Sequence, residues 1–125
     1  MPLIQISLLE GKSSEYIQAI ADGVHKALQT AWKIPENDQF QIITEYKKSH
    51  FIIDKTIWEG NRSDDVVVIY ITSILRTKEM KIHLYHELVD VLTTNPGVRK
   101  EDIFVTIVHN DREDWSFGKG IAQLL

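Results

Sequence analysis

The chain has 125 residues, a formal net charge of −4 at pH 7, 43% hydrophobic residues, 26% charged residues and no cysteine. This size and composition fit one globular domain, residues 1–125, and the acidic balance argues against a partner such as nucleic acid or an anionic membrane. The lack of cysteine excludes disulfides, thiolate catalysis and cysteine metal sites. No apolar run reaches membrane-spanning length and no signal-peptide pattern opens the chain, so we expect a cytoplasmic protein.

The first half of the chain has the pattern strand, helix, strand. Residues 3–6 are mainly large and apolar and indicate a buried strand that begins without a disordered leader. Ser13 or Ser14 can cap a helix over residues 14–32, whose apolar residues recur at helical spacing. After a turn, residues 40–43 predict a second strand.

The second half follows the same pattern after an irregular segment, 47–65. The continuous β-branched run at 66–71 is typical of a central buried strand. Thr77 can cap a second helix whose apolar stripe extends over residues 82–92, and residues 103–108 predict a further strand.

A shift of 64 positions lays the second half of the chain on the first without a gap. It superposes Leu3 on Val67, Ile4 on Val68, Ile20 on Leu84, Val24 on Leu88, Leu28 on Leu92, Asp38 on Asp102, Phe40 on Phe104 and Ile43 on Ile107. Each half, 2–62 and 66–125, is therefore predicted to be one βαβ unit. The expected fold class is α/β (α+β), with two tandem βαβ units that form one mixed sheet and two helices on one face. The other sheet face would keep its apolar residues, so we expect self-association.

Pro2 directly follows the initiator methionine. A small second residue usually allows Met1 to be removed, which would leave Pro2 as a free secondary amine at a strand end. A free α-amino group titrates near ~8, and desolvation lowers its pKa toward the range where an amine acts as acid or base at neutral pH. The alternative is a proline that merely opens an edge strand, where its missing N–H costs nothing. Under the shift Pro2 falls on Val66, so the repeat itself does not require proline there.

The start Pro2-Leu3-Ile4, the duplicated βαβ pattern and the ending Asp114-Trp115-Ser116-Phe117-Gly118 together resemble the tautomerase superfamily. The similarity is to its fused members, typified by malonate semialdehyde decarboxylase and its tautomerase relatives, and it runs over essentially the whole chain. The resemblance implies a tautomerase (MIF-like) fold, a homotrimer of fused chains, and catalysis by an amino-terminal proline without a cofactor or a metal.

The resemblance also implies roles for individual residues. Pro2 matches the catalytic proline, and Asp38 matches an aspartate thought to interact with the proline or with a water molecule. Arg76 matches an arginine that binds a substrate carboxylate. Where the decarboxylase-like members read Arg-Pro-Arg, this chain reads Ile74-Leu75-Arg76, so the first arginine is missing.

The same resemblance places Trp115, Phe117 and Leu124 in the hydrophobic wall of the substrate pocket. An apolar wall lowers the proton affinity of an amine and favours substrates with aromatic or alkyl groups. The chain ends at Leu125, before the usual tail of the family. Both this ending and the missing arginine count against decarboxylation.

These residues favour one reaction over its rivals. A tautomerase needs one base that returns the proton it took, and a cation such as Arg76 for the oxyanion that develops. We therefore predict keto–enol tautomerisation of a small oxo or enol acid, specifically a 2-oxo acid of the phenylpyruvate type. Two alternatives stay open: a decarboxylase or hydratase with a protonated Pro2, and a non-catalytic oligomeric module that binds a ligand.

Other polar residues carry weaker signals. Asp38 could instead cap a turn or pair with a lysine, since its counterpart Asp102 indicates a structural use of the position. His25, His83 and His86 lack an HExxH pattern or a carboxylate cluster, so we expect solvated helix histidines and no metal site. The sequence Gly11-Lys12-Ser13 fails the phosphate-loop motif because the required earlier glycine is an isoleucine.

Overall fold

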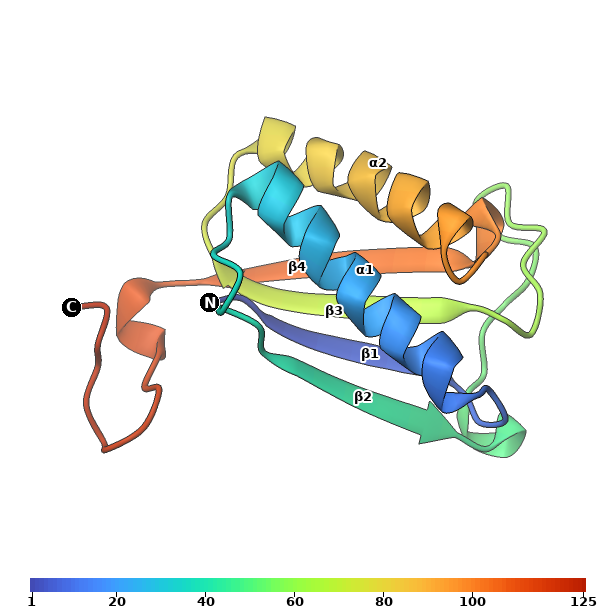
Figure 1. The fold of residues 1–125 in the computed structure, drawn as a ribbon, viewed down its shortest axis with the longest axis horizontal. Helices are drawn as coiled ribbons and strands as arrows, with labels where there is room; N and C mark the ends of the chain where they lie inside the picture. Colours follow the sequence, from blue (N-terminus) through green and yellow to red (C-terminus); the bar gives the residue numbers. More distant parts are fainter.

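The computed structural model describes residues 1–125. In it, two long helices pack on one four-stranded sheet (Figure 1). The elements confirm the predicted order of two βαβ units. In chain order they are β1 (Leu3–Leu9), α1 (Ser14–Trp32), β2 (Gln41–Tyr46), β3 (Val67–Ile74), α2 (Lys78–Thr94) and β4 (Ile103–Asn110), with single-turn 3-10 helices η1 (Lys48–His50), η2 (Lys100–Asp102) and η3 (Arg112–Asp114). None of the helices combines the length and the apolar character needed to cross a membrane.

Each long helix begins at the hydroxyl residue that the sequence indicated. The Ser13 side chain accepts a hydrogen bond from the N–H of Tyr16, and the Thr77 side chain accepts one from the N–H of Met80. These caps satisfy backbone donors that have no partner inside the helix. The buried side of each helix holds residues that the 64-residue shift superposes: Ile20, Val24 and Leu28 in α1, and Leu84, Leu88 and Leu92 in α2.

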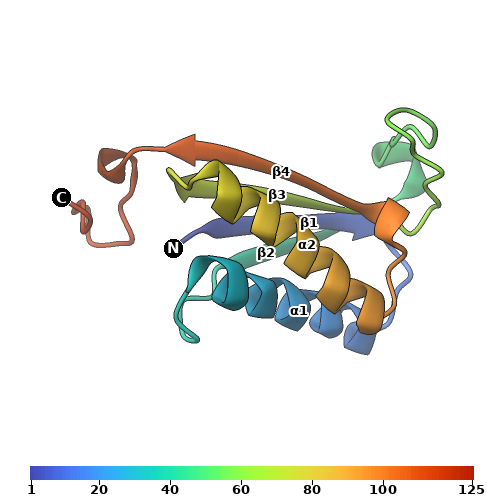
Figure 2. The same cartoon turned by 90° about the horizontal axis from the view of Figure 1, so that it is seen from above.

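The sheet has the strand order β2-β1-β3-β4, in which β1 and β2 are parallel, β3 and β4 are parallel, and β1 and β3 are antiparallel. The starts of β1 and β2 therefore lie at the same end of the sheet as the ends of β3 and β4. We call this the proline end; it is at the left of Figure 1. Figure 2 shows both helices on the same side of the sheet, as predicted.

The strand pairing corrects the gapless repeat in one element. Ile6 pairs with Ile43 in the first unit, and Ile71 pairs with Ile107 in the second. Ile43 and Ile107, in the two edge strands, are 64 positions apart in the sequence, but Ile6 and Ile71, in the two central strands, are 65 positions apart. The first unit therefore has one more residue between its first strand and its helix, and Pro2 corresponds in the sheet to Val67 rather than to Val66.

The two faces of the sheet differ in what covers them. Inward-facing residues of β1 and β3, such as Ile6, Ile69 and Ile71, are fully buried against the helices. Between them, Tyr70 faces the other way because successive strand residues alternate in direction. This uncovered face keeps large apolar side chains that are partly exposed: Ile42, Tyr70, Phe104 and Val108. The structure thus contains the apolar open face that the sequence predicted.

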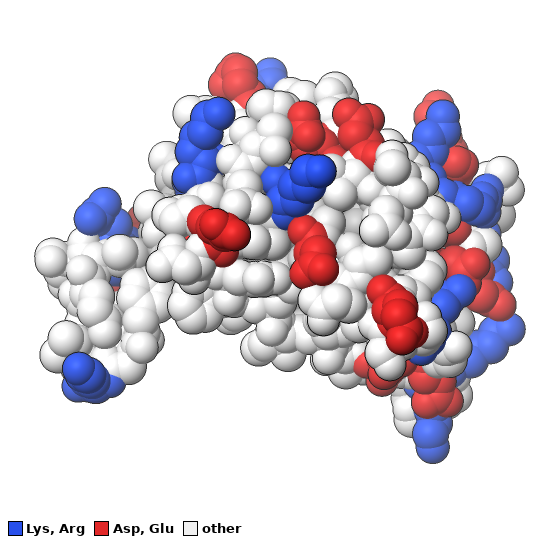
Figure 3. Space-filling view, viewed as in Figure 1, with Lys and Arg blue, Asp and Glu red and all other residues white.

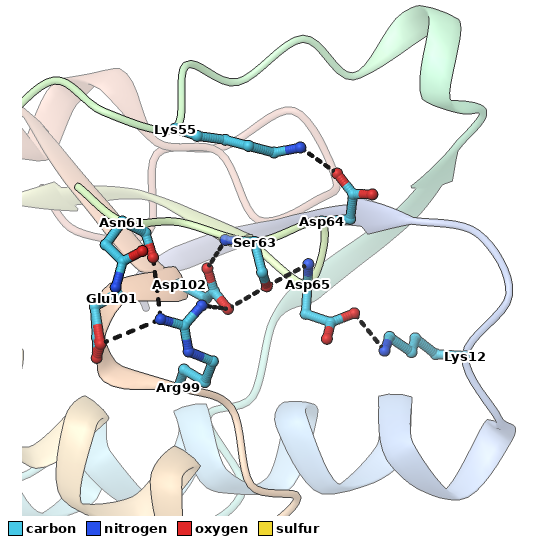
Figure 4. Close-up of polar contacts among 9 residues, drawn as sticks. All are labelled: Lys12, Lys55, Asn61, Ser63, Asp64, Asp65, Arg99, Glu101 and Asp102. Atoms are coloured by element: carbon cyan, nitrogen blue, oxygen red, sulfur yellow. Dashed lines mark hydrogen bonds and ion pairs between the residues drawn. The ribbon is translucent and has the colours of Figure 1, made fainter.

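Asp102 connects the long segment between β2 and β3 to the start of β4 (Figure 4). Its carboxylate is fully buried and accepts hydrogen bonds from the backbone N–H of Ser63 at 2.7 Å and from the Ser63 hydroxyl at 2.6 Å. The guanidinium of Arg99 lies 3.7 Å from the same carboxylate. The Ser63 hydroxyl in turn accepts from the N–H of Asp65. This counterpart of Asp38 therefore has a structural role.

Substitution of this carboxylate has a predicted cost in stability. Asp102→Ala leaves the N–H and hydroxyl of Ser63 without their acceptor inside the protein, so we expect the free energy of unfolding to fall by about 2–4 kcal/mol. Urea denaturation measures the change. Asp90→Ala, at an exposed position on α2, is the matched control and should alter stability by less than about 0.5 kcal/mol. Equal effects of the two substitutions would contradict the assigned role of Asp102.

Candidate active site

Pro2 is buried at the start of β1 and lines a cavity of about 290 Å³ at the proline end of the sheet. The cavity walls are mostly apolar. They are formed by Met1, Pro2, Leu3, Phe40, Trp115, Ser116 and Phe117. The beginning of β1 and the segment that follows β4 thus meet in one cavity, as the antiparallel pairing of β1 and β3 requires.

The aromatic wall of the cavity is held in place by its own hydrogen bonds. The rings of Trp115 and Phe117 stack with their centres 5.5 Å apart. The indole N–H of Trp115 donates to the side-chain oxygen of Asn110 at 2.6 Å, and the backbone N–H of Phe117 donates to that of Gln123 at 2.8 Å. These bonds fix two large apolar rings in a segment without regular secondary structure.

Asp38 lies in the turn that leads into β2. Its backbone N–H donates to the carbonyl oxygen of Pro35 at 3.0 Å, and its half-buried carboxylate forms an ion pair with the terminal ammonium of Met1. The carboxylate therefore faces the group that immediately precedes Pro2. It does not pair with a lysine, which was one of the uses considered from the sequence.

Arg76 follows β3 and is fixed by two buried side chains. Its Nε–H donates to the hydroxyl of Ser73 at 3.1 Å, and its guanidinium carbon lies 4.8 Å from the centre of the Trp32 ring. The indole N–H of Trp32 donates to the carbonyl oxygen of Met80, which fixes that ring. A cation over an aromatic face is attracted by the ring electrons.

The charge of Arg76 is affected by burial and by Asp38. Burial lowers the pKa of the Arg76 guanidinium from its ordinary value, and the negative charge of the Asp38 carboxylate acts in the opposite direction. Arginine stays protonated near neutral pH even when its pKa is depressed. The proline end thus combines a fixed cation, a carboxylate and an apolar cavity.

Two expectations from the sequence differ from the structure. Leu124 is not part of the cavity wall, and its carbonyl oxygen accepts a hydrogen bond from the side chain of Arg112. His25 is buried rather than solvated, and its Nε2 lies 2.7 Å from the carbonyl oxygen of Glu36. His25 lies among the inward-facing residues of α1, and this position in the sequence could have signalled its burial. Its contact with Glu36 links α1 to the turn that carries Asp38.

Sequence reasoning also missed residues that shape the site. Ser73 is a polar residue at an inward-facing position of β3, and Trp32 is the last residue of α1. Their role is visible only in the fold, which places both side chains in contact with Arg76. Phe40, which the sequence assigned to a strand, precedes β2 and lines the cavity.

Two family models match the chain, and each is described as a tautomerase enzyme. One covers residues 38–118 and the other residues 2–60. Two relatives, the probable tautomerases YusQ and YrdN of Bacillus subtilis (strain 168), are each 37% identical to the chain over all of its length, and the match covers 99% and 97% of those proteins. The chain belongs to the tautomerase family.

Solved structures of fused tautomerases share the fold. A malonate semialdehyde decarboxylase is 30% identical, with a TM-score of 0.92 over 98% of this chain and 95% of that one. The FG41 malonate semialdehyde decarboxylase, inhibited by 3-bromopropiolate, is 38% identical, with a TM-score of 0.90 over 97% and 92% of the two chains. A native fused 4-OT is 19% identical with a TM-score of 0.80, covering 98% of each chain, and it has the same fold.

The position of Arg76 yields a prediction for this tautomerase. Ser73→Ala removes the hydroxyl that orients the guanidinium, so the side chain must lose conformational freedom when it binds an anion. We expect the affinity for phenylacetate, followed by NMR through the indole N–H signal of Trp115, to weaken about threefold to tenfold. Thr72→Val removes a hydroxyl from the neighbouring position on the opposite sheet face and should leave that affinity unchanged. An unaltered affinity in Ser73→Ala would refute the positioning of Arg76 by Ser73.

Proposed function

We propose that this protein is a cofactor-free tautomerase that uses Pro2 as its acid–base group. Removal of Met1 makes Pro2 the terminal secondary amine, and the substrate is a 2-oxo acid of the phenylpyruvate type. The observation that carries this proposal is the burial of Pro2 in a cavity with stacked aromatic walls, at the end of the sheet that also holds Asp38 and Arg76. The related malonate semialdehyde decarboxylase supports it, since the structures of that protein include a variant in which its first residue, a proline, is replaced by alanine.

The chemistry requires one proton to move between two atoms of the same substrate. The neutral amine of Pro2 accepts the proton from the enol hydroxyl and returns it as an ammonium to the neighbouring carbon, so no second reactant is consumed. Negative charge on the substrate oxygens is stabilised by the guanidinium of Arg76, whose planar donors suit a carboxylate or an enolate. Trp115 and Phe117 hold the apolar part of the substrate and exclude water.

The role of Asp38 is to stabilise the protonated form of the Pro2 amine. Its carboxylate already pairs with a terminal ammonium in the structure, and after removal of Met1 the amine of Pro2 is the nearest terminal group. A carboxylate favours the protonated amine, whereas the apolar cavity favours the neutral one. Because these two effects of the carboxylate and the cavity oppose each other, a single amine can both take up and release a proton near neutral pH.

We also propose that the active assembly is a homotrimer. The uncovered sheet face carries partly exposed Tyr70, Phe104 and Val108, which a single chain leaves in water. A fused 4-OT with the same fold, at 18% identity and a TM-score of 0.76, forms a symmetric trimer. Association of this face with other copies would remove its apolar side chains from water.

A second candidate is a lyase or hydratase of the malonate semialdehyde decarboxylase type. The likeness to two such decarboxylases, at 30% and 38% identity, favours it. In this reaction Pro2 stays protonated and acts as an acid. Ile74 counts against it, because an apolar residue stands where the decarboxylase-like members have a further cation.

The proposal predicts how activity depends on Pro2. After intact-mass measurement has established that Met1 is absent, the ketonisation of enol-phenylpyruvate is followed by absorbance. Pro2→Ala replaces a rigid secondary amine by a flexible primary amine, and we expect kcat/KM to fall by about 100-fold or more. A protein with one additional residue that stays attached before Pro2 should lose as much, because its proline nitrogen is an amide. Full activity of that extended protein would contradict the proposal.

The pH dependence separates the two candidate reactions. A neutral amine acting as base is lost on protonation, so kcat/KM should rise with pH through the pKa of the Pro2 amine and then become constant. An ammonium acting as acid gives the opposite slope. A tautomerase rate that falls as pH rises through this pKa would contradict the base role, and turnover of malonate semialdehyde with that slope would establish the second candidate.

A further inference from the structure

The repeat places a second cavity at the opposite end of the sheet from Pro2. It has a volume of about 210 Å³ and lies where β1 ends and β3 begins. At the proline end, η3 leads into Trp115, Ser116 and Phe117. At the opposite end, η1 begins 64 residues earlier than η3 and leads into residues 51–53 (green in Figure 1). The two cavities therefore occupy equivalent places in the two βαβ units.

The walls of the second cavity correspond to those of the first. Phe51 is the counterpart of Trp115, and Ile53 is the counterpart of Phe117; both line the second cavity. Val66 lies directly before β3, as Pro2 lies directly before β1, although the strand register makes Val67 the counterpart of Pro2 in the sheet. Phe51 stacks on the ring of Tyr46 with 5.8 Å between the ring centres, so this wall is also fixed by an aromatic pair.

The second cavity lacks the group needed for proton transfer. Val66 lies inside the chain, so its backbone nitrogen is an amide and not a base. The polar lining of the cavity consists instead of two lysines, a serine and an aspartate. Charged side chains crowd this end of the molecule, at the right of Figure 3. Two of them, Lys48 and Lys55, line the cavity.

The charges at the second cavity do not cancel. The Nζ of Lys55 lies 2.7 Å and the Nζ of Lys48 lies 3.5 Å from the carboxylate of Asp64, which also lines the cavity (Figure 4 for Lys55). The hydrogen bond from Lys55 and the positive charges of both lysines hold the pKa of the Asp64 carboxyl below its usual range. Two ammonium groups thus share one carboxylate, which leaves one positive charge beside an apolar wall.

We propose that this second cavity binds a small organic acid, with a carboxylate and an apolar body, and does not transform it. The ligand carboxylate would bind to Lys48 and Lys55 and balance their remaining charge. Its apolar body would lie against Phe51, Ile53 and Val66. The inference goes beyond the proposed function and does not depend on it, because it rests on cavity walls and lysines that are remote from Pro2.

Binding can be tested separately at the two ends of the molecule. Full-length protein with ¹³C-labelled isoleucine methyl groups is titrated with phenylacetate. The methyl signals of Ile52 and Ile53 report on the second cavity, and the indole N–H signal of Trp115 reports on the first. We expect the Ile52 and Ile53 signals to shift and saturate. Signals of these methyl groups that stay fixed, while that of Trp115 shifts, would overturn the inference.

Lysine substitutions test the chemistry of the binding. In Lys48→Met with Lys55→Met, phenylacetate should bind the second cavity at least about tenfold more weakly, because two charge-assisted contacts are lost and Asp64 then repels the ligand. Lys47→Met removes the same charge from an exposed neighbour outside the cavity wall and should change the affinity less than about twofold. Unchanged Trp115 shifts in both proteins establish that the fold is intact. Equal effects of the double substitution and of Lys47→Met would refute the role of the two lysines.

Discussion

The antiparallel pairing of β1 with β3 determines where each candidate residue lies. Leu3 pairs with Thr72 and Ser7 pairs with Val68, so the beginning of each of these strands lies beside the end of the other. Because β2 and β4 run parallel to β1 and β3, the turns before and after them gather at the same two ends. Pro2, Asp38 and Arg76 are therefore gathered at one end of the sheet although they are far apart in the sequence.

The same pairing gives one chain two related ends with different chemistry. At one end a proline directly precedes β1 and the carboxylate of Asp38 forms an ion pair with a terminal amine. At the other end a valine precedes β3, and the corresponding carboxylate, Asp102, is fully buried in hydrogen bonds with Ser63. A duplicated unit can keep its geometry while only one copy keeps a reactive group. The difference lies in a few residues and not in the fold.

Much of the fold was predictable because short-range patterns determine it. The apolar spacing and the hydroxyl caps at Ser13 and Thr77 gave the helices, and the internal repeat gave the two βαβ units. The one-residue offset between Ile6 and Ile71 was not predictable, because the register depends on how strands from different elements pair. Strand β3 is also longer than its β-branched run, since pairing with β4 continues to Ile74.

The candidate site was predictable to a lesser degree. Pro2, Trp115 and Phe117 meet in one cavity, as the resemblance to tautomerases implied, and Leu124 does not reach it. The contacts of Ser73 and Trp32 with Arg76 join two elements, β3 and α1, to the turn before α2, and no sequence pattern marks them. The lysine-lined cavity was also missed, because Lys48 and Lys55 look like ordinary surface charges until the fold places them beside Phe51.

The central claim is that the nitrogen of Pro2 is a free amine that titrates. The chain has three prolines, Pro2, Pro35 and Pro96, so ¹⁵N-proline labelling gives three NMR signals, two of which are internal amides and serve as controls. The proposed function predicts that one signal shifts with pH around a midpoint at or below ~8, while the other two stay fixed. Three signals that do not move with pH would mean that the nitrogen of Pro2 is an amide, and the proposed role of Pro2 as base would then be wrong.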